Sequence, residues 1–492
     1  MNDKTESAID TSSGTAKEAG VARIHATAID GRSPKDPLSI QETVEHYLSA
    51  IWGINQTAKI ALPHISKWAI TEILSIQKKL EAFIPEIPEK GEGTKSFTLE
   101  SARELAEFTN TIRQLDEIQK QDSTSVLSKS LFTQLFAEFD AYLGELLKII
   151  YLKNDKLLKG ISREITLSDL MDFDDLNAVK LSMLEKEIET FRRDSYIEQF
   201  STLEKKFNLS LRKFKDWPEF IELSQRRNIL THNGGMVSDQ YLSQCDREGY
   251  KFEVRPRIGD NLGVKIEYFA SAVRLLSKVG LMLAYTLWSK VCPKELDKVH
   301  ESLNNAIFRC LEQKRWVFVS QLEDFVLSDP MLKQISEVNY RIRVVNIAIG
   351  LKFAKKDVEA GRLLDSVDWS ASYRDFKLAI AVLKECYDLA VEIMVSIGKT
   401  GEIIKQPDYH TWPLFTRFRE RPEFYAAYFK VYGETFSEKV ETSSGAVEAH
   451  AKSDGSIGKS DLNGNVVDVE AREVREESTA RGRDAGAIPA AE

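Results

Sequence analysis

Residues 131–152, LFTQLFAEFDAYLGELLKIIYL, decide the fold of this chain. Their apolar side chains recur every three or four residues, which places them along one side of an α-helix of about six turns. A helix with so continuous an apolar side has to bury it, so we expect it to form one wall of a helical bundle. The stripe consists of Leu131, Leu135, Phe139, Tyr142, Leu143, Leu146 and Ile149.

A second stretch predicts a helix that ends at His232. Asp216 can cap its first turn, and Pro218 fits there because the N–H that proline lacks would have no partner inside the helix. Glu219 stands at capping-box spacing. Residues 233–235, Asn-Gly-Gly, end the helix because both residue types accept a left-handed backbone. His232 is therefore expected in the last helical turn.

Other elements are expected to complete the bundle. The most apolar run, residues 279–288, is about half of the roughly 20 residues that a membrane-spanning helix requires. It is therefore interpreted as a buried helix, and no membrane is expected as a partner. The periodicity predicts further helices at 175–193 and 268–291, with short extended pieces at 252–254 and 264–266.

The C-terminal third contains an internal repeat. Tyr340-Arg341 and the apolar residues after it align with Tyr373-Arg374 at an offset of 33 residues. A period near 34 in helical sequence is typical of tetratricopeptide-like hairpins, which stack to bury their apolar sides. A third hairpin at 296–327 is expected to stack in front, and aromatic residues between 409 and 424 to cover the far end.

The expected organisation is all-α, with disordered termini that are poor in apolar residues. Residues 84–93 are interpreted as a Pro- and Gly-rich loop within the N-terminal region, for which no function is predicted. The predicted parts are a disordered tail at 1–36, an N-terminal helical region at 37–125, the bundle at 126–293, the helical repeats at 294–436 and a disordered acidic tail at 437–492.

Composition and the absence of known motifs argue against several classes of protein. A net charge of −9 argues against a protein that coats nucleic acid, because such binding needs a basic face. The four cysteines are scattered without metal-ligand spacing, and the first 36 residues lack the apolar core of a signal peptide, so a reducing, cytoplasmic location is expected. Phosphate-binding glycine loops, HExxH and GxSxG are absent from the sequence, and neither a metal nor a cofactor is predicted.

Arg227, Asn228 and His232 are the residues that most directly indicate chemistry. Arginine stays charged and can fork onto phosphate oxygens, while histidine can exchange a proton near neutral pH. Asn228 and His232 are four residues apart and share a side of the helix, and Arg227 lies about 100° round from Asn228. One phosphate group is expected to reach all three.

This pattern resembles that of the HEPN superfamily, helical domains whose signature is an Arg, a polar residue directly after it and a His a few residues on. The resemblance extends to the Gly234-Gly235 break, to residues 237–242 and to the helix around 139–143. It covers residues 126–293. The C-terminal region resembles the tetratricopeptide-like parts of uncharacterised bacterial proteins, which says little about activity.

The resemblance implies a metal-independent endoribonuclease that works as a homodimer through its HEPN-like domain. His232 would exchange protons, Arg227 would stabilise charge on the phosphate, and Asn228 would orient one of them. Family association implies a role in phage defence or as a toxin. An acid on a neighbouring helix often assists, and Asp140 and Glu145 are the candidates; an acid at Asp140 would be costly unless paired with a cation such as Arg227.

Because the chain as a whole is acidic, an RNA groove would need local cations. Arg226 is expected to be a solvated neighbour that steers RNA phosphates. The other local cations are Arg192, Arg193, Lys205 and Lys206.

A second hypothesis comes from another class of protein. The motif can instead be a capping arrangement, with Arg227 paired to a carboxylate and His232 bonded to carbonyls of its own helix. The chain would then be a non-catalytic interaction or scaffold protein, with a protein or peptide partner on its helical repeats. Open or buried positions of Arg227 and His232 distinguish the two.

Overall fold

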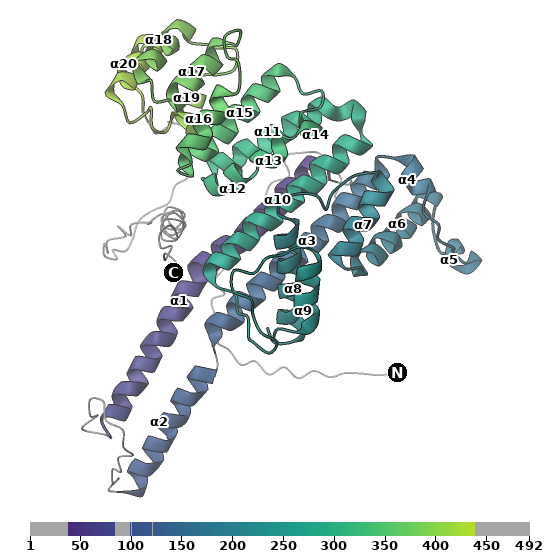
Figure 1. The fold of residues 1–492 in the computed structure, drawn as a ribbon, viewed down its shortest axis with the longest axis vertical. Helices are drawn as coiled ribbons and strands as arrows, with labels where there is room; N and C mark the ends of the chain where they lie inside the picture. Colours follow the sequence, from purple (N-terminus) through teal and green to yellow (C-terminus); the bar gives the residue numbers. More distant parts are fainter. Residues whose placement is uncertain (1–37, 84–98, 100, 121, 438–492) are drawn as a thin grey trace, which may run out of the picture. The chain divides into compact units, whose positions relative to one another are not determined.

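The computed structural model describes residues 38–83, 99, 101–120 and 122–437, and its described elements are helices (Figure 1). Backbone contacts divide the chain into two units, Met1–Leu38 and Ser39–Glu492. The described helices all belong to the second unit. The all-α prediction is confirmed for the described residues, where the one β-type pairing is an isolated bridge between Met236 and Asn261.

The core is built on three long helices, α1 (Ile40–Glu81), α3 (Ser123–Leu152) and α10 (Ile266–Val291), which pack on one another. A capping box starts α1, in which the Ser39 hydroxyl accepts from the Glu42 N–H and the Glu42 carboxylate accepts from the Ser39 N–H. The predicted stripe of residues 131–152 lies buried on α3, except that Leu131 is half-buried.

Two stacked tyrosines join the three long helices. The rings of Tyr47 on α1 and Tyr142 on α3 lie 4.1 Å apart. Both hydroxyls donate to carbonyls of α10, Tyr47 to Leu276 at 2.8 Å and Tyr142 to Gly280 at 2.8 Å. Gly280 is needed at this point, since a Cβ there would lie 2.3 Å from the Tyr47 ring.

α10 is the helix that the sequence analysis interpreted as buried. By length and composition alone it could cross a membrane, but 72% of its most apolar window is buried inside the protein. It begins at Ile266. The extended piece predicted at 252–254 lies in an irregular loop, whereas in the piece predicted at 264–266 Lys265 has an extended backbone that leads directly into the helix. Val254 is 87% exposed, so alternation of apolar residues there reflects no sheet.

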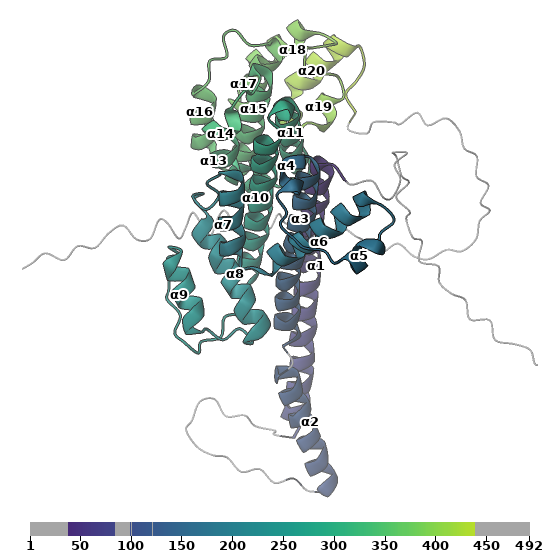
Figure 2. The same cartoon turned by 90° about the vertical axis from the view of Figure 1, so that its right-hand side faces the viewer.

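Of the remaining helices, those at 155–159, 176–193 and 217–232 pack on α3, whereas the helix at 102–120 packs on α1 and the helix at 239–247 packs on the one at 217–232 (Figures 1 and 2). Phe139 of α3 contacts the rings of Tyr196 and Phe220, at centroid distances of 5.6 and 5.7 Å. The predicted boundary at residues 125/126 falls within α3, whose partner across the core is α1. The elements are α2 (Ala102–Lys120), α4 (Asp155–Lys159), α5 (Leu167–Met171), α6 (Leu176–Arg193), α7 (Tyr196–Phe207), α8 (Trp217–His232) and α9 (Asp239–Arg247).

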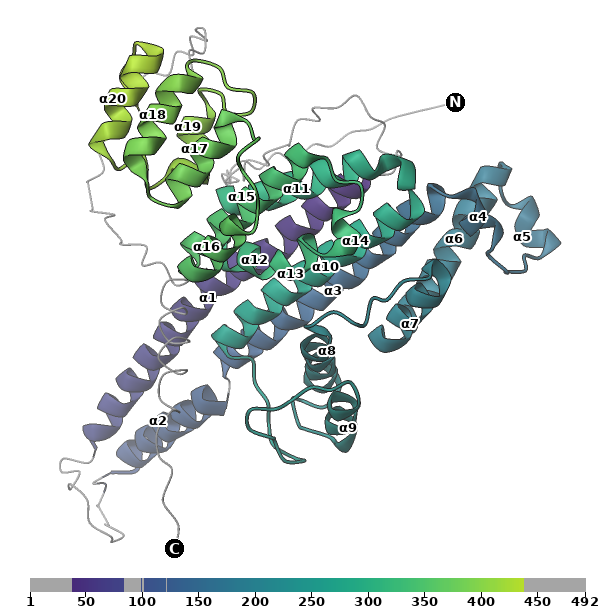
Figure 3. The same cartoon turned by 45° about the horizontal axis from the view of Figure 1, so that its top comes forward.

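The C-terminal part forms helical hairpins that share one kind of turn (Figure 3). Each turn has one non-glycine residue with a positive φ, namely Lys314, Lys355 or Glu385. The N–H of the residue that follows bonds back to a carbonyl five positions earlier in the chain. The predicted hairpins at 296–327 and around the repeat are therefore present as helical hairpins. They comprise α11 (Leu296–Glu312) with α12 (Trp316–Gln321), α15 (Glu337–Phe353) with α16 (Asp357–Asp365), and α17 (Arg374–Leu383) with α18 (Tyr387–Ile397).

Short elements connect and cover these hairpins. α20 packs on α18 and brings the aromatic residues of the predicted covering segment against it. The short elements are η1 (Pro293–Glu295), α13 (Glu323–Val326), α14 (Asp329–Leu332), α19 (Asp408–Thr411), η2 (Pro413–Phe415) and α20 (Pro422–Tyr432).

A buried arginine holds the first hairpins together. The Arg343 guanidinium on α15 donates to the Asn304 side chain at 2.9 Å and to the carbonyls of Val326 and Met331 at 3.2 and 3.1 Å. These partners are neutral, and burial lowers the pKa of Arg343 to about 10. The predictions for residues 1–36, for residues 84–93 and for the tail beyond 437 concern positions outside the described residues.

Candidate active site

α8 ends where the sequence predicted. The N–H groups of Asn233 and Gly235 both donate to the Ile229 carbonyl at 2.9 Å, and Gly234 and Gly235 have φ values of 59° and 91°. Their left-handed backbone closes the helix directly after His232. Asn233 itself has a φ of −132°, so the two glycines alone supply that conformation.

The start of α8 differs from the prediction. Asp216 is the N-terminal flanking residue, but its side chain makes no capping hydrogen bond. Its carboxylate instead accepts from the Lys278 ammonium group at 2.6 Å. A buried lysine needs a counter-charge more than a helix terminus needs a cap, because an unpaired buried ammonium is far costlier.

Arg227 pairs with Asp140, the partner that the sequence analysis named for it. A guanidinium nitrogen lies 3.7 Å from one Asp140 oxygen, and the Tyr196 hydroxyl donates to the other at 2.6 Å. The two charged side chains are 29% and 21% exposed, so the pair lies at the edge of the protein and not in its core. The arrangement joins α8, α3 and α7.

The pKa values of Asp140 and Tyr196 are both raised. Burial raises the pKa of the Asp140 carboxyl, against the opposing effects of the Tyr196 hydrogen bond and of the Arg227 and Arg192 charges. Burial and the neighbouring Asp140 raise the pKa of Tyr196 well above its ordinary value. Tyr196 therefore stays a hydrogen-bond donor to Asp140.

Arg227 is only partly engaged by its neighbours. One guanidinium nitrogen donates to the Asn228 side-chain oxygen at 3.3 Å, while the buried Nε has no hydrogen-bond partner within the described part of the chain. An incompletely bonded guanidinium retains capacity for an anionic ligand. Asn228 thereby positions Arg227.

His232 is exposed in the last turn of α8. Across the described ranges its ring makes no hydrogen bond or ion pair, so the proposed bond to carbonyls of its own helix is absent there. Five residues separate it from Arg227, which corresponds to about 7.5 Å along the helix and about 140° round it. The imidazole and the guanidinium therefore start from different sides of α8, and no hydrogen bond joins them among the described residues.

The prediction that Arg226 is a solvated cation is wrong. Its side chain is 14% exposed, bonds to the Glu222 carboxylate at 2.8 and 3.0 Å and lies over the Tyr268 ring. The hydroxyls of Tyr241 and Tyr268 also donate to Glu222, at 2.6 and 2.7 Å. The i,i+4 spacing of Glu222 and Arg226 on one helix was the signal that could have predicted this pair.

The remaining predicted residues are separated by the fold. Glu145 is half-buried, and no bond joins it to Arg227 among the described residues. Arg193 pairs with Glu189, and Lys206 bonds to Tyr151, so both serve local contacts. Arg192 is exposed and lies beside Gly144, close enough to Asp140 to affect its pKa. Lys205 is exposed.

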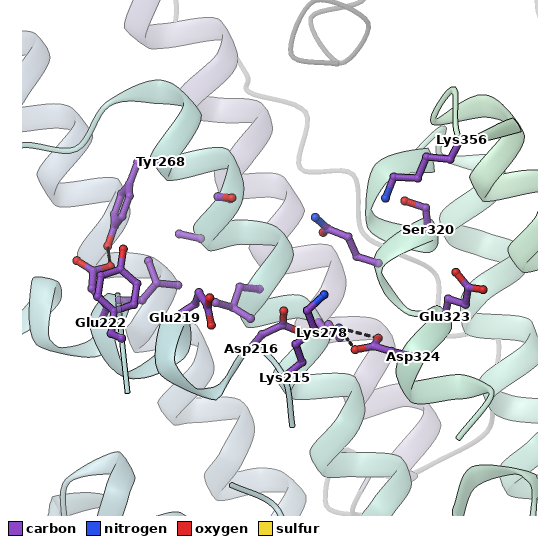
Figure 4. Close-up of a pocket in the computed structure, with 16 residues that line it drawn as sticks. Lys215, Asp216, Glu219, Glu222, Tyr268, Lys278, Ser320, Glu323, Asp324 and Lys356 are labelled. Carbon is purple, nitrogen blue, oxygen red and sulfur yellow. Dashed lines mark hydrogen bonds and ion pairs between the residues drawn. The ribbon is translucent and has the colours of Figure 1, made fainter. Parts of the chain in front are cut away.

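A polar pocket of about 590 Å³ lies between the first half of α8, α10 and the hairpin residues 320–324 (Figure 4). At its floor the Lys278 ammonium, almost fully buried, bonds to Asp216 and to Asp324 at 2.6 and 2.8 Å. Glu222 forms part of its wall. No local spacing in the sequence indicates this contact, because Asp216, Lys278 and Asp324 are up to 108 positions apart.

A metal site and similarity to known proteins are two further kinds of information on function. The described residues contain no group of three His, Cys, Asp or Glu side chains that could hold a metal ion. No family model, no curated protein and no solved structure matches the chain.

Proposed function

We propose that this protein is a metal-independent endoribonuclease whose site is formed by Arg227, Asn228 and His232 on α8 and by Asp140 on α3. The observation that supports it most is an exposed imidazole in the last turn of α8, one and a half turns from a partly bonded guanidinium. A local capping motif would instead have bonded His232 to carbonyls of its own helix; the Arg227–Asp140 pair fits both hypotheses. Tyr196 belongs to the site as a positioning residue, because it acts through Asp140.

The proposed reaction is attack of a ribose 2′-hydroxyl on the adjacent phosphorus. The 2′-oxygen forms a bond to phosphorus, its proton passes to a base, and the 5′-oxygen of the next nucleotide leaves and takes up a proton. The products are a 2′,3′-cyclic phosphate and a 5′-hydroxyl. His232 exchanges one of these protons.

Arg227 supplies the positive charge that the reacting phosphate requires. Asp140 holds the guanidinium from one side, and Asn228 limits its rotation. Charge that is fixed before the reaction stabilises the transition state without reorganisation at the moment of bond exchange. Asp140 is proposed as the assisting acid in preference to Glu145, because it alone of the two contacts Arg227.

The proposed enzyme is a homodimer in which the ends of two α8 helices line one RNA groove. Arg226 is no longer proposed as an RNA contact, since its donors serve Glu222 and the Gly263 carbonyl. Roles in phage defence or as a toxin, and a cytoplasmic location, are part of the proposal; the first rests on the HEPN resemblance, and the second on four free cysteines.

Incubation of the purified protein with mixed RNAs in EDTA tests the proposal. The wild type should cleave, and His232→Ala should not. His64→Ala is the matched control, because His64 is also an exposed helical histidine but lies on α1. Absence of cleavage by folded protein would favour the interaction-protein hypothesis, with the helical hairpins as the binding surface.

A further inference from the structure

The second half of α1 and α2 lie side by side and run antiparallel (Figures 1 and 2). This hairpin carries exposed apolar side chains. α3 and α10 pack on α1, whereas α2 packs on α1 alone among helices with extensive contacts. The two hairpin helices meet through Phe83 and Phe108, whose rings lie 5.8 Å apart. Each helix has a contact side, represented by the buried Ile76 on α1 and Thr111 on α2.

Four side chains on the hairpin remain about half exposed. Ile70 and Leu74 on α1 are 56% and 58% exposed, and Leu105 and Ile112 on α2 are 56% and 45% exposed. We call these four residues the hairpin stripe. Two helices can cover only the sides that face each other, so apolar residues off that side need a further partner.

The four residues lie on the same side of the hairpin. At 100° per residue, Ile70 and Leu74 stand about 110° round α1 from its contact side, and Leu105 and Ile112 about 90° round α2, both in the direction of increasing residue number. Antiparallel helices viewed from one end turn in opposite senses, so these similar rotations point the two pairs the same way. Trp68, 56% exposed, stands about 110° round α1 in the other direction.

The stripe is also continuous along the hairpin. Ile112 comes four residues after Phe108 and therefore lies level with Lys79 of α1, about 7.5 Å from Leu74 along the axis. The stripe thus runs obliquely, from Ile70 on α1 to Leu105 near the hairpin tip. A two-fold axis along such a line brings the stripe onto its own copy and lays α1 of one copy across α2 of the other.

Charge and size both suit a second copy as the occupant. Residues 62–81 carry three lysines and two glutamates, net +1, whereas α2 carries three basic and four acidic residues, net −1. Crossing α1 over the partner's α2 therefore pairs opposite signs. An exposed Leu or Ile offers on the order of 100 Å² of apolar surface, so the stripe leaves about 215 Å² on each copy, which can form the apolar centre of a small dimer interface with a polar rim.

We propose that the α1–α2 hairpin is a self-association surface, on which the hairpin stripe of one copy packs against that of a second copy. This proposal does not depend on ribonuclease activity. If α8 also mediates dimer formation, each copy carries two association surfaces, and loss of the hairpin stripe leaves the α8 dimer.

Sedimentation equilibrium of the full chain tests the surface. Leu74→Glu/Ile112→Glu should raise the dissociation constant of wild-type association at least ~100-fold, because two carboxylates on each copy would meet in an apolar interface. Trp68→Glu is the matched control, with the same change on the opposite side of the same helix, and should leave the constant unchanged. Thermal unfolding of both variants verifies their fold.

Hydrogen exchange of the wild type gives a second readout without any substitution. Residues 70–74 and 105–112 should exchange more slowly at high than at low protein concentration. A wild type that stays monomeric, a double variant that keeps the wild-type mass at every concentration, or loss of association in Trp68→Glu alone would overturn the proposal. Protection of the stripe that does not change with concentration would also overturn it, because the occupant would then be part of the same chain.

Discussion

Replacement of Glu222 by leucine should destabilise the protein strongly, because Glu222 is the counter-charge of Arg226. Glu222 is 2% exposed and accepts two bonds from Arg226 and one each from Tyr241 and Tyr268. Leucine leaves a guanidinium that is 14% exposed without a carboxylate. Loss of one partner of a buried ion pair costs about 3 to 5 kcal/mol.

Two companion variants separate charge from packing. Glu222→Gln retains an oxygen acceptor of similar shape and should cost less, about 1 to 3 kcal/mol. Glu222→Leu/Arg226→Met removes both charges and should recover part of the loss, since an apolar pair leaves no unpaired ion. Glu219→Gln is the control on the same helix, where an exposed side chain should change stability by under about 0.5 kcal/mol.

Urea unfolding monitored by circular dichroism measures all four variants. The expected loss is a large share of the ~5 to 15 kcal/mol that stabilises a typical domain, so Glu222→Leu should unfold at a clearly lower urea concentration. A cost below about 1 kcal/mol for Glu222→Leu would refute the reasoning. So would a double variant that is less stable than Glu222→Leu alone.

Four further variants test other features of the structure. Tyr196→Phe removes the hydroxyl that donates to Asp140 and should cost about 1 to 2 kcal/mol in urea unfolding; no change would mean that the bond contributes nothing. Burial raises the pKa of Asp140, so its contribution to stability is fully present below the ordinary value of about 3.9 and is lost as pH rises through the folded pKa. The stability advantage of the wild type over Asp140→Asn should therefore shrink as pH rises from about 3 to 7, and a growing advantage would contradict the raised pKa. Gly280→Ala should cost about 1 to 3 kcal/mol through the clash with Tyr47, whereas Gly53→Ala, with open space around it, should stabilise by about 0.5 to 1 kcal/mol; equal effects on the melting temperature would contradict this difference.

Local patterns in the sequence predicted the helices well. The α3 stripe follows from a spacing of three and four residues, and the end of α8 follows from Gly234 and Gly235, whose backbone requirement is local. Asp140 was named as a partner of Arg227 because an acid on an apolar helix needs a cation, and this pair is present. Such inferences succeed where one helix or one strong physical need determines the result.

Contacts between distant segments could not be predicted in the same way. Tyr196 reaches Asp140 only because α7 packs beside α3, and no spacing in the sequence encodes that approach. Asp216 was expected to cap α8, but the lysine that occupies its carboxylate comes from α10, 62 positions away. Arg226 was expected in solvent, but Glu222 lies four residues earlier on the same helix and pairs with it.

Cleavage of two matched oligonucleotides in EDTA tests the central claim most directly. One is all RNA, and the other has a single 2′-deoxy nucleotide at the position where the first is cut. The wild type should cut only the all-RNA strand and leave a 2′,3′-cyclic phosphate. The His232→Ala and Arg227→Ala variants should not cut either strand. Cleavage of the deoxy-substituted strand at the same bond, or full activity in the His232→Ala variant, would contradict this claim.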